Sequence, residues 1–157
     1  MDYSKPHTLE EWIAFYEEKT QDKFECPAGF NFLWMPYRGF TVFKPDKESG
    51  IFLIYLTCGD GHFWYDVFEM IALQSGYTKL MTICTRKIKP YIRFWHWRIE
   101  KELDVNGQKR FFCKDELNRN VLITHRGVDE KSGIATYYVT KYLMQGEGPN
   151  LDATQKG

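Results

Sequence analysis

The segment from residue 51 to residue 84 constrains the fold most, because it places a helix between two short apolar runs. The first run, at 51–57, is rich in the aliphatic and aromatic residues that strands favour. After the turn at 59–61, apolar side chains recur at intervals of three and four residues: Trp64, Val67, Phe68 and Ile71. This spacing predicts an amphipathic helix over about 62–75. A strand, a crossover helix and a second strand predict a parallel β-α-β unit.

The remainder of the chain predicts mostly antiparallel pairing. Thr8 and Glu11 have the capping-box spacing, which predicts a helix over about 9–22. Strands are expected near 30–35, 39–44 and 51–57, and a short helix is expected around Pro90. Four alternating runs follow residue 97, and Asn106-Gly107 between two of them is a specific hairpin signal. The expected fold class is α+β, with a mixed, mostly antiparallel sheet, one β-α-β unit and a C-terminal antiparallel extension.

The length of 157 residues predicts a single domain. We expect this domain to span 1–143, and a flexible tail to span 144–157, where apolar anchors are lacking. The net charge of zero argues against a protein that binds nucleic acid through its overall charge. The four cysteines form no C-x-x-C pair and no zinc-finger spacing, so no metal site is predicted. No signal peptide or membrane span is recognised, so we expect a cytoplasmic protein with free thiols.

The turn between the run at 51–57 and the helix has two interpretations. A helix N-terminus offers unpaired N–H groups and partial positive charge, so a glycine turn there can bind phosphate. Equally, it can be a plain connector in which Asp60 or Gly61 is the N-cap. Cys58 beside this N-terminus has a weaker alternative role as a nucleophile. We expect Cys58 to be partly exposed, Cys84 and Cys113 to be buried or half-buried, and Glu69 to face solvent.

A resemblance to a known family bears on this choice. The stretch Leu56-Thr57-Cys58-Gly59-Asp60-Gly61 resembles the Q/R-x-x-G-x-G/A loop of the GNAT family of N-acetyltransferases. Both glycines match, and Leu56 stands at the Gln or Arg position. Ala72 and Gly76 resemble the end of the helix that follows the loop in that family. The pattern T-R-x-x-P-x-x-x-R, from Thr85 to Arg93, is similar to divergent acetyltransferase-like proteins encoded by bacterial viruses.

The resemblance implies an acetyltransferase-like fold that binds acetyl-CoA and transfers an acyl group to a small-molecule or peptide amine. The residues that it implies for cofactor binding are Cys58, Gly59, Asp60, Gly61 and His62. It also implies that Tyr91 is the general acid, because a phenol near the cofactor sulfur can protonate the leaving group. The alternative for Tyr91 is packing against Phe94 and Trp95.

A second function follows from the stretch 86–98, in which basic residues alternate with aromatic ones. Cations among stacking side chains suit single-stranded nucleic acid, and they also suit the 3′-phosphate of CoA. A solvated helix edge with buried aromatics is the third interpretation. The chain is therefore either an acyltransferase or a catalytically degenerate module of the same fold that binds nucleic acid or a protein. No membrane partner is expected.

Overall fold

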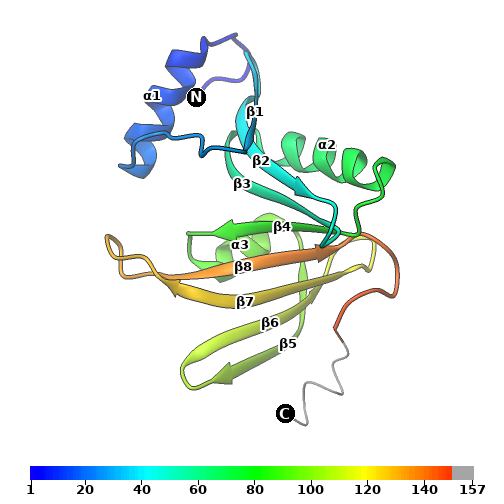
Figure 1. Ribbon diagram of the computed structural model, residues 1–157. Helices are drawn as coiled ribbons and strands as arrows, with labels where there is room; N and C mark the ends of the chain where they lie inside the picture. The colour runs from blue at the N-terminus through cyan, green and yellow to red at the C-terminus, as the bar shows by residue number, and fades with distance from the viewer. Residues whose placement is uncertain (150–157) are drawn as a thin grey trace.

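The sheet of the computed structural model is continuous across eight strands, in the order β1-β2-β3-β4-β8-β7-β6-β5 (Figure 1). The structure describes residues 1–149, and the part of the expected tail at 150–157 lies outside them. The helices are α1 (Leu9–Thr20), α2 (Gly61–Gln74) and α3 (Ile88–Phe94). The strands are β1 (Asn31–Met35), β2 (Gly39–Asp46), β3 (Ile51–Gly59), β4 (Lys79–Cys84), β5 (Arg98–Val105), β6 (Gln108–Lys114), β7 (Asn120–Val128) and β8 (Ala135–Tyr142).

Two short sequence patterns form the local structures that they predict. The hydroxyl of Thr8 accepts a hydrogen bond from the N–H of Glu11 at 3.1 Å, and the Glu11 carboxylate accepts one from the N–H of Thr8. At Asn106-Gly107 both residues have positive φ, and the flanking residues Val105 and Gln108 pair directly. The capping box and the hairpin are therefore confirmed.

The predicted β-α-β unit is also confirmed. β3 and β4 are parallel, whereas every other described strand pair is antiparallel. The last four strands form a meander, and β8 returns to pair with β4. The C-terminal strands thus continue the central sheet, and the fold is α+β with a mixed, mostly antiparallel sheet.

The helices cover the two faces of the sheet unequally. Leu80 packs with the α2 cluster and Cys84 with the α3 cluster, so α2 and α3 lie on one face of β4. On the other face, Trp12 of α1 packs against Phe40 and Cys58. α1 lies over the β1–β3 end of the sheet only, away from the strands β5–β8 (Figure 1).

A β-bulge in β3 connects these two layers. Val42 pairs with Leu56 and Phe43 pairs with Ile54, so Tyr55 is the extra residue. The bulge reverses the alternation of side chains, because Phe52 and Ile54 pack toward α2 whereas Leu56 and Cys58 pack toward α1.

The segment after β8 contacts the turn between β6 and β7. The side-chain amide of Gln145 donates to the carbonyl of Leu117 at 2.6 Å. The amide of Asn120 donates to the carbonyl of Glu147 at 2.7 Å. Residues 144–149, the described part of the expected tail, are therefore attached to the domain.

Candidate functional site

The candidate site begins where the parallel strands β3 and β4 separate. They pair only over Ile51–Ile54 and Lys79–Thr82, although β3 continues to Gly59 and β4 to Cys84. Among the residues that the structure describes, the second half of β3 therefore has no strand partner on its β4 side (Figure 1). Ligands of open α/β sheets bind at the carboxyl ends of such parallel strands, and the glycine turn lies at this end.

Gly59 is explained by close contact between two backbones. Its φ is +109°, and a Cβ atom there would lie 2.3 Å from the carbonyl oxygen of Arg38. The same carbonyl accepts hydrogen bonds from the N–H of Asp60 at 3.0 Å and from Nε1 of Trp64 at 2.9 Å. The turn is therefore fastened to the β1–β2 loop, and this contact alone requires a glycine at position 59.

Asp60 is the N-cap of α2, which was one of the two expected roles for this turn. Its carboxylate accepts from the N–H of Phe63 at 3.2 Å, and its second oxygen lies 2.5 Å from Nη1 of Arg38. The guanidinium of Arg38 also lies over the ring of Phe63. A carboxylate and a cation thus share the start of the helix, while the N–H groups of Gly61 and His62 lie at its first two positions, where no intrahelical acceptor exists.

Trp95 joins the turn to the candidate acid. Its ring lies 3.7 Å from the Cβ position of Gly61, and its centroid lies 4.7 Å from that of His62. On its other sides it contacts Tyr65, at 4.3 Å between centroids, and Tyr91, at 6.1 Å. Its Nε1 is buried and is the one such side-chain atom in residues 1–149 without a hydrogen-bond partner. A buried donor without a partner is costly, and the Trp95 side chain interacts with the nearby hydroxyl of Tyr91.

Tyr91 both packs and forms hydrogen bonds. Its hydroxyl lies 3.3 Å from the hydroxyl of Tyr65 and 3.4 Å from Oγ1 of Thr82. Burial raises the pKa of Tyr91, and burial raises the pKa of Tyr65 well above its usual value. Both phenols are therefore protonated at neutral pH.

Cys58 does not belong to this group. The thiol is buried with Trp12 and Phe40 on the α1 face, and burial raises its pKa to about 11. The expectation of a partly exposed Cys58 is wrong, because the bulge at Tyr55 directs residue 58 away from α2, and the raised pKa also argues against its alternative role as a nucleophile. Cys84 and Cys113 are buried as expected, and all four thiols are free.

The basic stretch 86–98 divides between surface and core. Its exposed cations are Arg86, Lys87, Lys89, Arg93 and Arg98. Glu102 pairs with Lys89 and Glu100 pairs with Arg98. Phe94 is 50% exposed and stacks on His62 with 4.4 Å between centroids, whereas Trp97 is buried. Phe94 is the one exposed aromatic side chain of this stretch, and three of its exposed cations form no salt bridge in the described structure: Arg86, Lys87 and Arg93.

An open hollow of about 560 Å³ lies at the carboxyl end of β4. Its lining comprises Thr85, Thr136, Tyr138 and residues 126–131 of the β7–β8 hairpin. Lys131 of this hairpin donates to the carbonyl of Gln21 and forms an ion pair with Asp22, both just after α1. Tyr138 alternates with the buried Tyr137, so it faces away from α2 and α3. The hollow therefore lies on the α1 face of the sheet, beside the end at which β3 and β4 separate.

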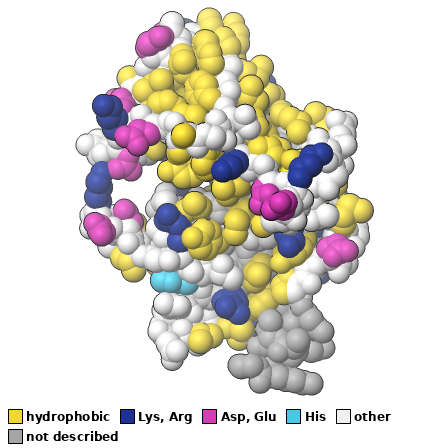
Figure 2. Space-filling model, viewed as in Figure 1, with side chains coloured by type: hydrophobic (Ala, Val, Ile, Leu, Met, Phe, Trp, Pro, Cys, Tyr) yellow, Lys and Arg dark blue, Asp and Glu magenta, His cyan; other side chains and the backbone are white. Residues whose placement is uncertain are grey.

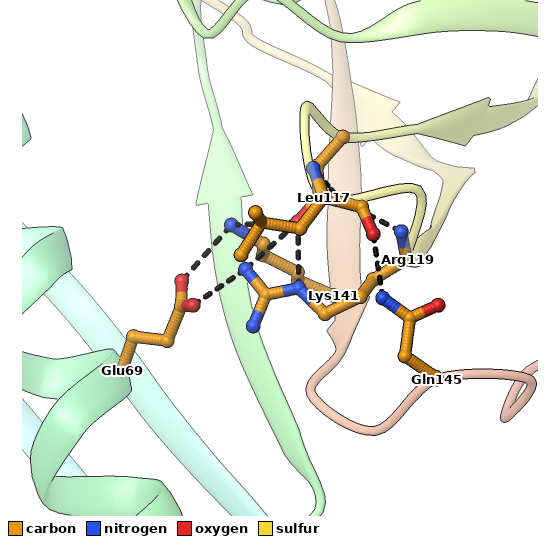
Figure 3. Close-up of polar contacts among 6 residues, drawn as sticks. Glu69, Leu117, Arg119, Lys141 and Gln145 are labelled. Carbon is orange, nitrogen blue, oxygen red and sulfur yellow. Dashed lines mark hydrogen bonds and ion pairs between the residues drawn. The ribbon is translucent and has the colours of Figure 1, made fainter.

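A second charged group was not anticipated from the sequence (Figure 3). Glu69 of α2 contacts Arg119 at 2.5 Å and Lys141 at 3.0 Å, and Asp115 contacts both cations, at 2.8 Å and 3.3 Å. The prediction that Glu69 faces solvent is wrong, since its carboxylate bridges α2 to β8 and to the β6–β7 turn. The negative charges of the two carboxylates and the positive charges of the two cations cancel. We therefore interpret this cluster as a structural connection between α2, β8 and the β6–β7 turn.

Comparison with protein-family models, with curated proteins and with solved structures finds no match to this chain. The geometry alone therefore defines the class: an α+β protein built on a mixed, mostly antiparallel sheet. Within residues 1–149, no helix has the length and apolar character needed to cross a membrane.

Proposed function

We propose that the protein is an acetyl-CoA-dependent N-acyltransferase of the acetyltransferase-like kind. The carrying observation is the separation of β3 from β4, which leaves a strand edge open inside the sheet beside the N-terminus of α2. An open strand edge pairs with an extended ligand that carries amide groups, as the pantetheine arm of CoA does.

The residues around the turn fit the cofactor in part. The N–H groups of Gly61 and His62 and the guanidinium of Arg38 would hold the pyrophosphate, whereas the carboxylate of Asp60 would oppose it. Arg38 offsets that carboxylate through its ion pair. When bound, acetyl-CoA supplies an activated acyl thioester. Tyr91 would hold a proton at its hydroxyl for the departing thiolate, and the hollow beside Thr85 would admit the amine from the α1 face.

Thermal unfolding with and without acetyl-CoA tests the proposal. A ligand at about a hundred times its Kd adds roughly 2.7 kcal/mol to the stability of the folded state. Arg38→Met should remove most of this shift. Arg126→Met is the matched control, because Arg126 also lies over an aromatic ring but borders the hollow. Equal shifts in both variants, or no shift in the wild type, would contradict cofactor binding at the turn.

Tyr91→Phe separates binding from catalysis. The variant keeps the ring but loses the proton, so it should retain the acetyl-CoA shift and lose acyl transfer. Transfer is followed as thiol release in the presence of a panel of primary amines. If the wild type binds acetyl-CoA but releases no thiol with any amine, the chain is a binding protein for the cofactor.

The second candidate is a catalytically degenerate module that binds single-stranded nucleic acid. Two observations favour it: the carboxylate of Asp60 already caps α2, and Trp95 already covers Gly61. The groups that remain for such a ligand are the Phe94–His62 pair and the exposed cations Arg86, Lys87 and Arg93 of the same stretch. Stacking on such a platform contributes about 1–3 kcal/mol per base.

Fluorescence anisotropy with a labelled single-stranded oligonucleotide tests this candidate. The association constant should fall as the salt concentration rises. A plot of its logarithm against the logarithm of the salt concentration should have a slope of about −0.7 for each phosphate contacted. Phe94→Ala should reduce affinity at every salt concentration, and Leu117→Ala, a similar truncation at an exposed site, should not. Absence of binding at low ionic strength would exclude this function.

A further inference from the structure

The two edges of the sheet differ sharply in sequence. β5 forms one edge, and five of its eight residues are charged: Arg98, Glu100, Lys101, Glu102 and Asp104. It also carries a bulge between Ile99 and Lys101. Charges and bulges on an edge strand prevent pairing with another chain. β5 is therefore a protected edge.

β1 forms the other edge and lacks both protections. Its five residues, Asn31–Met35, include no charged side chain, and its register with β2 is continuous. Leu33, Trp34 and Met35 are 44%, 39% and 43% exposed, and Tyr37 beyond the strand is exposed too. Figure 2 shows hydrophobic side chains gathered over this end of the molecule. An uncharged, straight, apolar edge is suited to strand addition.

We propose that β1 pairs antiparallel with β1 of a second copy of this chain, which joins the two sheets across a two-fold axis. Centred on Leu33, this pairing places Phe32 opposite Trp34 and Asn31 opposite Met35 in both copies. Aromatic side chains directly opposite each other stabilise antiparallel strands, and no like charges meet. The net charge of the chain is zero, so two copies do not repel each other overall.

The two-fold symmetry is what favours a second copy as the occupant. An isologous contact needs one surface that is complementary to itself, and an uncharged strand is complementary to itself in the antiparallel direction. A five-residue strand makes a small interface, of the kind that forms weak and transient complexes. The dimer should therefore dissociate on dilution.

Sedimentation velocity of the full chain over a wide concentration range tests the proposal. The wild type should pass from monomer to dimer as concentration rises. Leu33→Lys should remain monomeric, because the symmetry places two lysines directly opposite each other. Leu117→Lys, the same change at an exposed leucine in the β6–β7 turn, should dimerise as the wild type does. Circular dichroism confirms that each variant is folded.

Mixing two variants with opposite charges at residue 33 provides the decisive part of the experiment. Leu33→Lys and Leu33→Glu should each be monomeric alone and should form a heterodimer when mixed, because residue 33 meets residue 33. A wild type that stays monomeric at every concentration would overturn the proposal, and β1 would then be open to a strand of a different protein. A dimer that survives Leu33→Lys, is lost in Leu117→Lys, or is not restored by mixing would overturn it equally.

Discussion

Nη2 of Arg119 lies 2.5 Å from Oε1 of Glu69, which ties the helix of the β-α-β unit to the turn between two C-terminal strands. The Arg119 side chain is only 6% exposed, and it also contacts Asp115 at 2.8 Å. Without Arg119, one cation, Lys141, remains for the two carboxylates, so the cluster keeps one uncompensated negative charge. We expect Arg119→Met to lower the free energy of unfolding by about 3–5 kcal/mol, measured by urea denaturation.

A surface ion pair provides the control for this prediction. Arg98 and Glu100 are 2.7 Å apart but exposed, so Arg98→Met should cost no more than about 1 kcal/mol. Similar losses in the two variants would mean that the buried cluster adds nothing beyond ordinary surface charge.

The same cluster predicts a pH dependence. Burial alone would raise the pKa of Asp115, but the backbone N–H of Arg119, its guanidinium and Lys141 together lower it. A lowered pKa in the folded state means that this group stabilises the fold above its unfolded pKa of about 3.9 and loses that contribution as the pH falls below it. The denaturant concentration at the urea midpoint should therefore decrease as the pH drops from about 5 through the lowered pKa of Asp115, and Asp115→Asn should flatten this part of the profile. An unchanged acid limb in Asp115→Asn would contradict the assignment.

Gly59 should tolerate no side chain. A Cβ would collide with the backbone of Arg38, and positive φ costs other residues about 1–2 kcal/mol in addition. Gly59→Ala should therefore lower the melting temperature strongly. Gly133→Ala is the control, since its φ is +71° but nothing lies within 4 Å of the added carbon. Equal melting temperatures for the two variants would mean that the β1–β2 loop yields easily at this point.

The thiols should differ in reactivity. Cys26 is exposed, whereas Cys58, Cys84 and Cys113 are buried, and burial raises the pKa of Cys113 to about 12. We expect Ellman's reagent to find four thiols in denaturant and a single fast-reacting one in the native protein. Cys26→Ser should abolish the fast phase. A fast phase that persists in this variant would place another thiol at the surface.

The features that could be predicted from the sequence depend on neighbours along the chain. The Thr8–Glu11 box, the Asn106-Gly107 hairpin and the β-α-β unit each arise within a short segment, where capping, turn and periodicity rules apply. The position of β8 beside β4 is different, because it depends on a pairing between distant segments. Local propensity carries no information about it.

The candidate site was only partly predictable for the same reason. The glycine turn, His62 and Tyr91 could be selected from residue type and spacing, and Trp95 does bring His62 and Tyr91 to one indole. Arg38 comes from the β1–β2 loop, so no pattern around the turn indicates it. Glu69 was misassigned because its cationic partners lie in remote segments. Of Arg38, Glu69 and Tyr65, only Tyr65 could have been placed at the site from local spacing. It follows Gly61 by four residues and therefore lies on the same face of α2.

The bulge at Tyr55 has a consequence for what a single deletion can do. Phe52 and Ile54 serve one apolar layer, and Leu56 and Cys58 serve the layer on the opposite side of the same strand. Strict alternation would send all four to one face. Loss of residue 55 would therefore remove the bulge without exchanging the two faces, because Ile54 and Leu56 would become neighbours and would keep their opposite orientations.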